Sequence, residues 1–445
     1  MNKFQRQKGL YSSRTDWNEY PIYSAIVCFV LIYLSPFVSL WLNYLAFAIF
    51  LYRIIRYDES VFAIDYCALA GVSYIFLTTG RVSLLAWLSI AAVLWYVVKN
   101  GVLNTPSLVW LVILLDYMLL RMQTAINEFV LCFSQLALLF ILISTQKKGT
   151  VVQSVQAFCF NVFFSSVYSL IFRNTTQLRS LLGSEKAAYW GSSLMRFQGL
   201  FRDPNYYMTT VVIAIALIAV LWINKDISNR TFIGGTCCLV FFGALTYSKT
   251  FIIVLAVCAL IFVAMLFYKK HYLLGSISII VGCVMAVVLA KTLFSVTLYR
   301  IFSTNNLYDF TTGRSELYVE YFYEITSSAG LLFFGAGLSA DILERGTHNL
   351  FLEIIYYFGV VGFFLIMAYF FSLLHLMKRS FTKNGQEQKG VFPYSVLIIF
   401  AILFCTLQGF FFAITYVMLY LSILATKITP QYGSFSTVSR IQEQD

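Results

Sequence analysis

Arginines and one histidine recur in the polar segments that separate long apolar runs of the chain. Arg196 and Arg202 lie in one such segment, and Arg314 and His348 lie in a later one. A guanidinium group binds phosphate oxygens through two parallel hydrogen bonds and stays charged at neutral pH. Histidine titrates near neutral pH and can accept a proton from a hydroxyl group. These residue types predict a site that holds a phosphate-bearing substrate and activates a hydroxyl.

The segment that contains Arg196 and Arg202 ends in a helix-starting motif. It reads Arg-Phe-Gln-Gly-Leu-Phe-Arg-Asp-Pro-Asn from 196 to 205, and an apolar run follows. Proline is pre-organised for the first turn of a helix, and the free N–H groups of that turn favour anions. We therefore expect a loop folded back against the membrane. The alternative is that the two arginines only contact lipid headgroups or pair with Asp203.

Further motifs follow along the chain. Lys249 lies in a short turn between apolar runs, where a lone lysine often only extends to the membrane interface. Arg314 follows a glycine, and His348 precedes an apolar helix. His348 either acts as a base or caps that helix, and Glu353, one turn into it, either orients His348 or bonds at the helix terminus. The candidate substrate-binding residues are Arg202, Asn205, Lys249, Asn349 and Glu353.

The elements that position these motifs are membrane-spanning helices. Of the 445 residues 60% are hydrophobic and 11% are charged, whereas soluble proteins are about 45–50% apolar and about 25% charged. This composition excludes a soluble enzyme, a nucleic-acid-binding protein and a disordered chain. The net charge of +11 comes from basic residues in short loops, as is typical of membrane proteins. The expected partner of the chain is therefore the lipid bilayer.

Length predicts an all-α, polytopic helical bundle with about 12–14 membrane-spanning helices. Apolar runs occur near residues 21–36, 38–52, 61–78, 82–98, 106–120, 127–144, 151–172, 205–223, 231–247, 250–268, 272–294 and 350–374. A last stretch, 391–425, is too long for one upright helix, so it forms either a hairpin near Gln408-Gly409 or one long tilted helix. Nothing divides the chain, so residues 1–445 form a single domain.

The positions of lysine and arginine predict the orientation. In one alternating assignment about 19 of the 31 basic residues, including the N-terminus and the 375–390 loop, face one side, which we assign to the cytoplasm. Residues 173–204 and 295–349 then face outward, and the second segment is expected to be partly helical. About 12 basic residues stay on that side, against the topological bias. The site is therefore predicted to face outward.

The outer segments contain no motif for a metal or a nucleotide. They hold no Asp-x-Asp pair, no His-Glu-x-x-His sequence and no P-loop. The nine cysteines lie within or at the edges of apolar runs, and we expect them to be buried and free of disulfides. These patterns predict a reaction without metal or cofactor. Outside the cytoplasmic membrane there is no pool of nucleotide sugars, so a glycosyl donor there has to be activated on a lipid.

In the order of these motifs the chain resembles the O-antigen ligase and polymerase superfamily of bacterial membrane proteins. The resemblance covers roughly residues 190–375, and the first half matches only as generic apolar helices. The motifs that carry it are Arg196-x-x-Gly199, Pro204-Asn205, Ser248-Lys249, Gly313-Arg314, Gly335-x-Gly337, and His348-Asn349 before a helix with Gly359 and Gly362.

The resemblance implies a metal-independent, inverting glycosyltransferase in the bacterial cytoplasmic membrane. The donor in that family is a glycan on undecaprenyl pyrophosphate, and it is presented at the outer face of the membrane. The acceptor is another such glycan or a related acceptor. By position, Arg196 and Arg314 would hold the pyrophosphate, with Arg202 sharing this role, and His348 would activate the acceptor hydroxyl. We expect the three catalytic residues to line one outward cavity. Many members have arginine at the position of Lys249, and lysine keeps the charge but loses the two parallel hydrogen bonds.

Three functions stay open from the sequence. A polymerase passes the growing chain to another lipid-linked repeat unit, with a flippase and a chain-length regulator as partners, whereas a ligase passes it to lipid A core or a protein. The 43 phenylalanines and 30 tyrosines favour a polymerase, since polymerases of this family are rich in aromatic residues. The third function is a transporter or lipid flippase. Against it, the clearest acidic residues within spans, Asp65 and Asp116, show no obvious paired partner in a second half of the chain.

Overall fold

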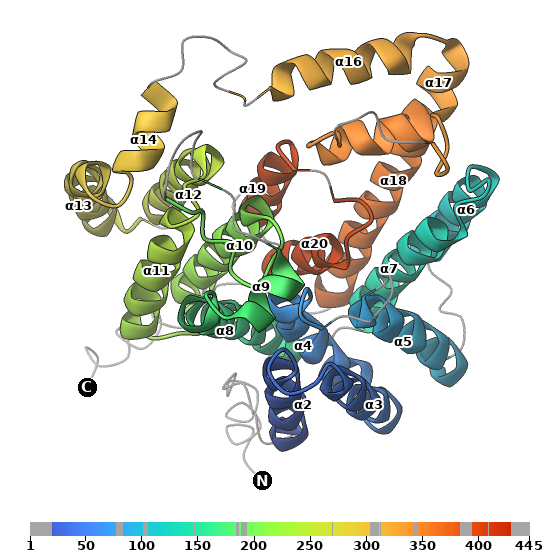
Figure 1. Cartoon of the computed structure of the whole chain (residues 1–445), viewed down its shortest axis with the longest axis horizontal. Coiled ribbons are helices and arrows are strands. Elements are labelled where there is room, and N and C mark those ends of the chain that lie inside the picture. Colours follow the sequence, from blue (N-terminus) through green and yellow to red (C-terminus); the bar gives the residue numbers. More distant parts are fainter. Residues whose placement is uncertain are drawn as a thin grey trace, which may run out of the picture.

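The computed structural model of the chain is built from helices, and no strand occurs among the residues that it describes (Figure 1). These residues are 20–76, 83–100, 106–145, 148–183, 187, 194–268, 270–302, 311, 313–340, 346–382, 394–407 and 409–428. Outside them lie several residues that the predicted orientation and hairpin involve: the N-terminus, Lys147, Lys383, Lys389 and Gln408.

Helices follow one another along the described chain. Their bounds are α2 (Ile22–Leu34), α3 (Trp41–Arg56), α4 (Glu59–Leu69), η2 (Ala70–Val72), α5 (Leu84–Asn100), α6 (Pro106–Leu120), α7 (Ile126–Thr145), α8 (Lys148–Phe172), α9 (Thr176–Leu182), α10 (Pro204–Ile223), α11 (Asn229–Ala244), α12 (Lys249–Tyr268), α13 (Tyr272–Lys291), α14 (Ser295–Phe302), α16 (Arg314–Thr326), α17 (Ala329–Phe334), α18 (Leu350–Thr382), α19 (Ser395–Phe404) and α20 (Ala413–Ala425). Helices α14, α16 and α17 confirm that the large outer segment is partly helical.

Six helices of the described chain are long and apolar enough to cross a membrane: Ile126–Thr145, Thr150–Phe172, Pro204–Ile223, Lys249–Tyr268, Tyr272–Lys291 and Leu350–Lys378. Shorter apolar helices of 10–17 residues accompany them. The all-α, multi-pass membrane architecture is therefore confirmed. The number of 12–14 spans stays a prediction, because several apolar runs form helices shorter than the about 20 residues that a full crossing needs.

The stretch 391–425 contains the predicted hairpin and not one long helix. Helix α19 ends at Phe404, and α20 begins at Ala413. Glu353 of α18 holds the turn between them, since its Oε2 accepts hydrogen bonds from the backbone N–H groups of Gly409 (2.8 Å) and Phe410 (3.0 Å). The turn is thereby fixed next to the start of α18.

Helix α10 is central, whereas α13 lies at the edge of the bundle. In the apolar window of α10 83% of the residues are buried, against 6% in α13. Helix α10 packs against α8, α11, α12, α19 and α20, and Figure 1 shows α13 and α14 at the periphery. The start of α10 is therefore a well-anchored point from which polar side chains can be positioned.

Close glycine contacts attach the large outer segment to α18. Helix α18 kinks at Gly359, whose φ is +67°, and a Cβ atom there would lie 2.3 Å from the carbonyl oxygen of Phe333. Gly335 also has a positive φ, +74°. The backbone N–H of Gly337 donates to the carbonyl oxygen of Tyr357 at 3.0 Å. The Gly335-x-Gly337 motif therefore serves packing, and it fixes α17 against the membrane part of the protein.

A buried ion pair joins α3 and α4. Arg53 donates to both carboxylate oxygens of Asp65, at 2.8 and 2.9 Å, and both side chains are buried. The hydroxyl of Tyr20 also donates to Asp65, and Arg53 donates to the carbonyl oxygen of Pro21 at 2.8 Å. A buried carboxylate that is paired and hydrogen-bonded in this way is a structural connection between helices. Asp116, the second acidic residue that the sequence singled out, is exposed on α6.

Candidate functional site

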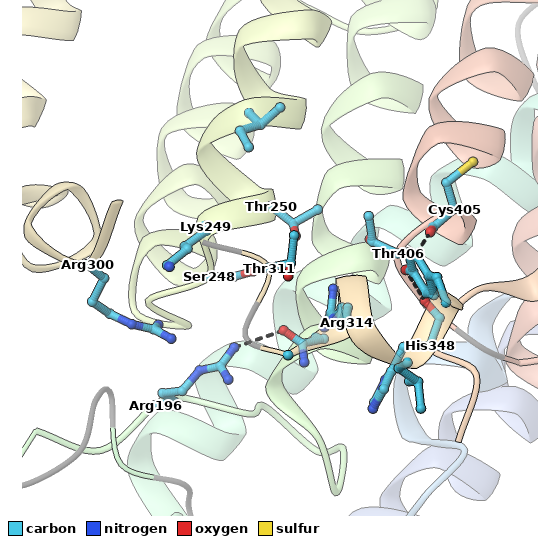
Figure 2. Close-up of a pocket in the computed structure, with 15 residues that line it drawn as sticks. Arg196, Ser248, Lys249, Thr250, Arg300, Thr311, Arg314, His348, Cys405 and Thr406 are labelled. Carbon is cyan, nitrogen blue, oxygen red and sulfur yellow. Dashed lines mark hydrogen bonds between the residues drawn. The ribbon is translucent and has the colours of Figure 1, made fainter. Parts of the chain in front are cut away.

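A cavity of about 400 Å³ opens where several helices begin (Figure 2). Five predicted site residues line it: Arg196, Asn205, Lys249, Arg314 and His348. The other lining residues are Ser248, Thr250, Ile253, Arg300, Thr311, Gly313, Leu317, Tyr318, Cys405 and Thr406. The fold thus brings the two predicted arginines and the histidine to one cavity, although they are far apart in the sequence.

Two hydrogen bonds hold the guanidinium of Arg196 at the cavity wall. Its Nε donates to the carbonyl oxygen of Thr246 at 2.8 Å, and its Nη2 donates to Oδ1 of Asn205 at 2.9 Å. A guanidinium has five N–H donors. Within the described chain these two bonds therefore leave three donors of Arg196 for a ligand.

The loop from 196 to 203 is packed into the bundle. Phe197 and Phe201 are each 1% exposed. Gly199 has a φ of +57°, and a Cβ atom there would lie 2.3 Å from the ring of Tyr207. Glycine is therefore required at this position of the Arg-x-x-Gly motif. The loop folds back against the helices, and its predicted position against the membrane stays a prediction.

Asp203 and Pro204 start α10 at the cavity. Asp203 is the N-cap residue, and its Oδ1 accepts a hydrogen bond from the backbone N–H of Asn205 at 2.7 Å. Pro204 occupies the first helical turn, as the motif predicts. The cap fixes the backbone of Asn205, whose side chain then holds Arg196.

Four helices begin at this cavity. Helix α10 begins at Pro204, α12 at Lys249, α16 at Arg314 and α18 at Leu350, and a residue in or next to each first turn lines the cavity. The N-terminal end of a helix carries a partial positive charge. Capping side chains already bond some of the first-turn N–H groups here, since Asp203 accepts from Asn205 and Asn349 accepts from Phe351. Backbone and side chains therefore favour the same kind of ligand, an anion.

The cavity carries an excess of positive charge. Four cationic side chains line it: Arg196, Lys249, Arg300 and Arg314. No carboxylate belongs to the described residues that line it. Burial lowers the pKa of Arg196 to about 10. The charges of Arg300 and Arg314 lower this pKa too, while Asp203 opposes them. Arg196 stays protonated at neutral pH, and an anion bound beside it relieves the repulsion from its cationic neighbours.

His348 has an uncommon backbone conformation. Its φ is +48°, in the left-handed region that few residues other than glycine adopt. The hydroxyl of Tyr318 lies 3.2 Å from the carbonyl oxygens of His348 and Cys405. The cap of α18 is Asn349, whose Oδ1 accepts from the backbone N–H of Phe351 at 2.9 Å. The capping role therefore belongs to Asn349, and His348 lines the cavity.

Three predicted binding residues have other places in the structure. Asn349 caps α18, and Glu353, which is 4% exposed, bonds the α19–α20 turn in place of His348. Arg202 is exposed, and its Nε donates to the carbonyl oxygen of Leu181 at 3.3 Å. None of the three is among the described residues that line the cavity. In this structure each uses its polar group on the backbone, and these contacts are structural.

Arg300 lines the cavity although no motif singled it out. It lies on α14, and its Nη1 donates to the carbonyl oxygen of Tyr247. Figure 2 shows Arg300 and Arg196 at one end of the cavity and His348 at the other, with Arg314 between them. Its position in the sequence could have identified it as a site residue, since Arg300 is one of the basic residues on the predicted outer side.

The cysteines differ from the expectation that all are buried. All nine are free, but Cys237, Cys283 and Cys405 are exposed. In a membrane helix an apolar residue can face lipid, so its apolar character does not require burial in protein. Cys405 also lines the cavity. No cluster of three metal-ligating side chains occurs in the described part of the chain.

Comparison with models of protein families, with curated proteins and with solved structures finds no match to this chain.

Proposed function

We propose that the chain is a membrane glycosyltransferase that polymerises oligosaccharide repeat units carried on undecaprenyl pyrophosphate, at the outer face of the bacterial cytoplasmic membrane. One observation carries the proposal: four cations, one histidine and four helix N-termini surround a single cavity. A diphosphate matches this charge, and its oxygens match the hydrogen-bonding geometry of guanidinium groups.

The residues take distinct roles in the proposed reaction. The oxygen of the acceptor hydroxyl attacks the anomeric carbon of the donor sugar, while the bond from this carbon to the phosphate oxygen breaks. The electron pair of that bond stays with undecaprenyl pyrophosphate, whose charge Arg196 and Arg314 stabilise. The hydroxyl proton passes to His348. A single displacement of this kind inverts the anomeric configuration.

One feature of the cavity supports transfer between two lipid-linked sugars, and a second feature, outside the cavity, speaks against transport. Its cationic end and its histidine are separated, with Arg314 between them (Figure 2). The leaving diphosphate and the attacking hydroxyl therefore have separate places. The buried Asp65 is held by Arg53 and by Tyr20, and this weakens the argument for a proton-coupled transporter.

Lipid-linked glycans of a deletion strain test the proposal. Loss of a polymerase leaves single repeat units on the carrier lipid, and complementation with Arg196→Ala, Arg314→Ala or His348→Ala should leave the same pattern. Complementation with Arg202→Ala, outside the cavity, should restore full-length polymer. Long chains on the carrier lipid in the deletion strain would identify a ligase. Movement of carrier lipid by the purified protein without any joining of sugars would identify a transporter.

A further inference from the structure

The residues on both sides of His348 are fixed by hydrogen bonds before α18. The hydroxyl of Thr347, a residue that is 2% exposed, donates to the carbonyl oxygen of Asn349 at 3.1 Å. The Oδ1 atom of Asn349 accepts from the backbone N–H groups of Phe351 at 2.9 Å and Leu352 at 3.0 Å. A non-glycine residue with a φ of +48° keeps this conformation only where its surroundings hold it. The direction of the His348 carbonyl group then decides where the imidazole points.

Tyr318 of α16 binds this carbonyl group. Its hydroxyl donates to the carbonyl oxygen of His348, and the carbonyl oxygen of Cys405 lies at the same distance, 3.2 Å (Figure 2). A hydroxyl has one proton, so the two carbonyl oxygens share it. Burial raises the pKa of Tyr318, and the phenol therefore keeps the proton that it donates. Tyr318 thus connects the start of α18 with the end of α19.

Helix α16 also carries Arg314, the arginine nearest to His348 in the proposed mechanism. Arg314 lies four residues before Tyr318, on the same face of the helix, and both line the cavity. Leu317, between them, is 5% exposed, and α16 packs against α17 and α18. One anchored helix therefore carries both the arginine assigned to the leaving diphosphate and the phenol that holds the backbone of His348.

We propose that Tyr318 is a positioning residue, which directs the imidazole of His348 into the cavity at a fixed place relative to Arg314. This inference rests on the proposed function and deepens it. A general base acts only within hydrogen-bonding reach of the proton that it accepts, and a misplacement of about 1 Å can cost about 10²-fold in rate. Tyr318 itself takes no part in the proton transfer, because its proton is bonded to backbone carbonyl oxygens. It acts on kcat through His348.

A double-mutant cycle on the purified full-length protein tests this role. The four proteins are the wild type, Tyr318→Phe, His348→Asn and the double variant, and in vitro polymerisation at saturating donor gives the kcat of each. Tyr318→Phe should lower the wild-type kcat at least about tenfold. It should leave the kcat of His348→Asn unchanged, because no imidazole is left to be positioned. The KM for the donor and the affinity for inorganic pyrophosphate should stay at their wild-type values.

Tyr117→Phe is the matched control. The hydroxyl of Tyr117 also lies between two backbone carbonyl oxygens, 2.6 Å from that of Phe358 and 3.3 Å from that of Phe334. Tyr117 is not among the described residues that line the cavity. Tyr117→Phe should therefore keep the kcat of its background, with or without the imidazole of His348.

A second measurement needs no activity. Hydrogen exchange over residues 347–352 should be faster in Tyr318→Phe than in the wild type and in Tyr117→Phe, because one bond to this backbone is lost. Unchanged exchange would show that the phenol does not hold His348, whatever the reaction is. If the wild type transfers no sugar, the proposed function is overturned, and the exchange still decides whether Tyr318 holds this segment.

Two kinetic results contradict the positioning role. A loss of kcat by the same factor in both backgrounds would show that Tyr318 acts independently of His348, on the substrate or on the fold. A wild-type kcat in Tyr318→Phe would show that the position of the imidazole does not depend on the phenol.

Discussion

Arg300 shows how a single side chain can add to the charge of the cavity from a peripheral helix. It lines the cavity, and burial lowers its pKa. We expect Arg300→Ala to weaken binding of inorganic pyrophosphate about tenfold, because a charge-assisted contact contributes about 1.5–3 kcal/mol. The melting temperature at increasing pyrophosphate concentration measures this affinity. An unchanged shift in Arg300→Ala would place the diphosphate away from α14, and Arg202→Ala is the matched control on the exposed surface.

The left-handed backbone of His348 decides which substitution tests its chemistry. Asparagine tolerates a positive φ, whereas alanine adds strain at a φ of +48°. His348→Asn therefore removes the imidazole and keeps the backbone. We expect this variant to lower kcat by about 10²–10⁴-fold while the affinity for pyrophosphate stays the same. In vitro polymerisation at saturating donor measures kcat. Polymer formation at the wild-type rate in His348→Asn would show that the histidine is no base.

At the level of elements, the kink of α18 connects the outer helices to the membrane part. In Gly359→Ala the new Cβ would meet the Phe333 carbonyl oxygen at 2.3 Å, and the residue would keep an unfavourable φ of +67°. We expect a loss of about 2–4 kcal/mol in stability and a displacement of α17. Hydrogen exchange of the 313–340 segment measures the displacement. Gly330→Ala, whose Cβ would contact only the Ser328 hydroxyl at 3.8 Å, is the control.

Asp226 lies in the turn between α10 and α11, and the loss of its proton destabilises the folded protein. Burial raises the pKa of Asp226 to about 6. The folded protein thus holds this proton more tightly than the unfolded chain, and stability is lost as pH rises from about 4 through 6. Asp226→Asn should therefore stabilise the protein by about 1–2 kcal/mol at pH 8 and have no effect near pH 4. Thermal unfolding at both pH values checks this. An equal effect at both would mean that the proton is not involved, and Glu316→Gln on the exposed side of α16 is the control.

Over the whole molecule, the sequence predicted the structural features that residues close together in the chain determine. The apolar runs, the start of α10 at Pro204 and the hairpin near Gly409 follow from period, length and capping chemistry, which neighbouring residues determine. The convergence of Arg196, Arg314 and His348 on one cavity was also predicted, from the resemblance that their motifs carry.

The patterns that failed involve partners far away in the chain. Glu353 was expected to bind substrate, to orient His348 or to bond at the terminus of its helix, yet it bonds a turn 56 residues later. Arg300 was not singled out, because only the packing of α14 beside the Tyr247 carbonyl brings it to the cavity. Gly335 was treated as part of a motif with no assigned role, and its contact with α18 gives it one. Pairings of this kind depend on tertiary packing, which a single sequence does not encode in its local pattern.

The two ends of the long helices differ in the residues that they carry. Helices α10 and α18 both begin at the cavity. At their other ends, the side chain of Asn224 donates to the carbonyl oxygen of Ile428 at 3.0 Å. The pKa of Lys427 is lowered by burial and then by the charge of Lys378. These lysines lie on the side that the basic residues assign to the cytoplasm.

Two serine N-caps at the opposite ends provide a matched test of this orientation. Ser228 caps α11 and Ser328 caps α17, both are exposed, and each substitution removes the same type of cap. With a membrane-impermeant maleimide, Ser328→Cys should be labelled in intact cells, above the background of the native cysteines. Ser228→Cys should be labelled only after the cells are permeabilised. The reverse result would place the cavity in the cytoplasm, where nucleotide sugars are available, and would remove the reason to expect a lipid-linked donor.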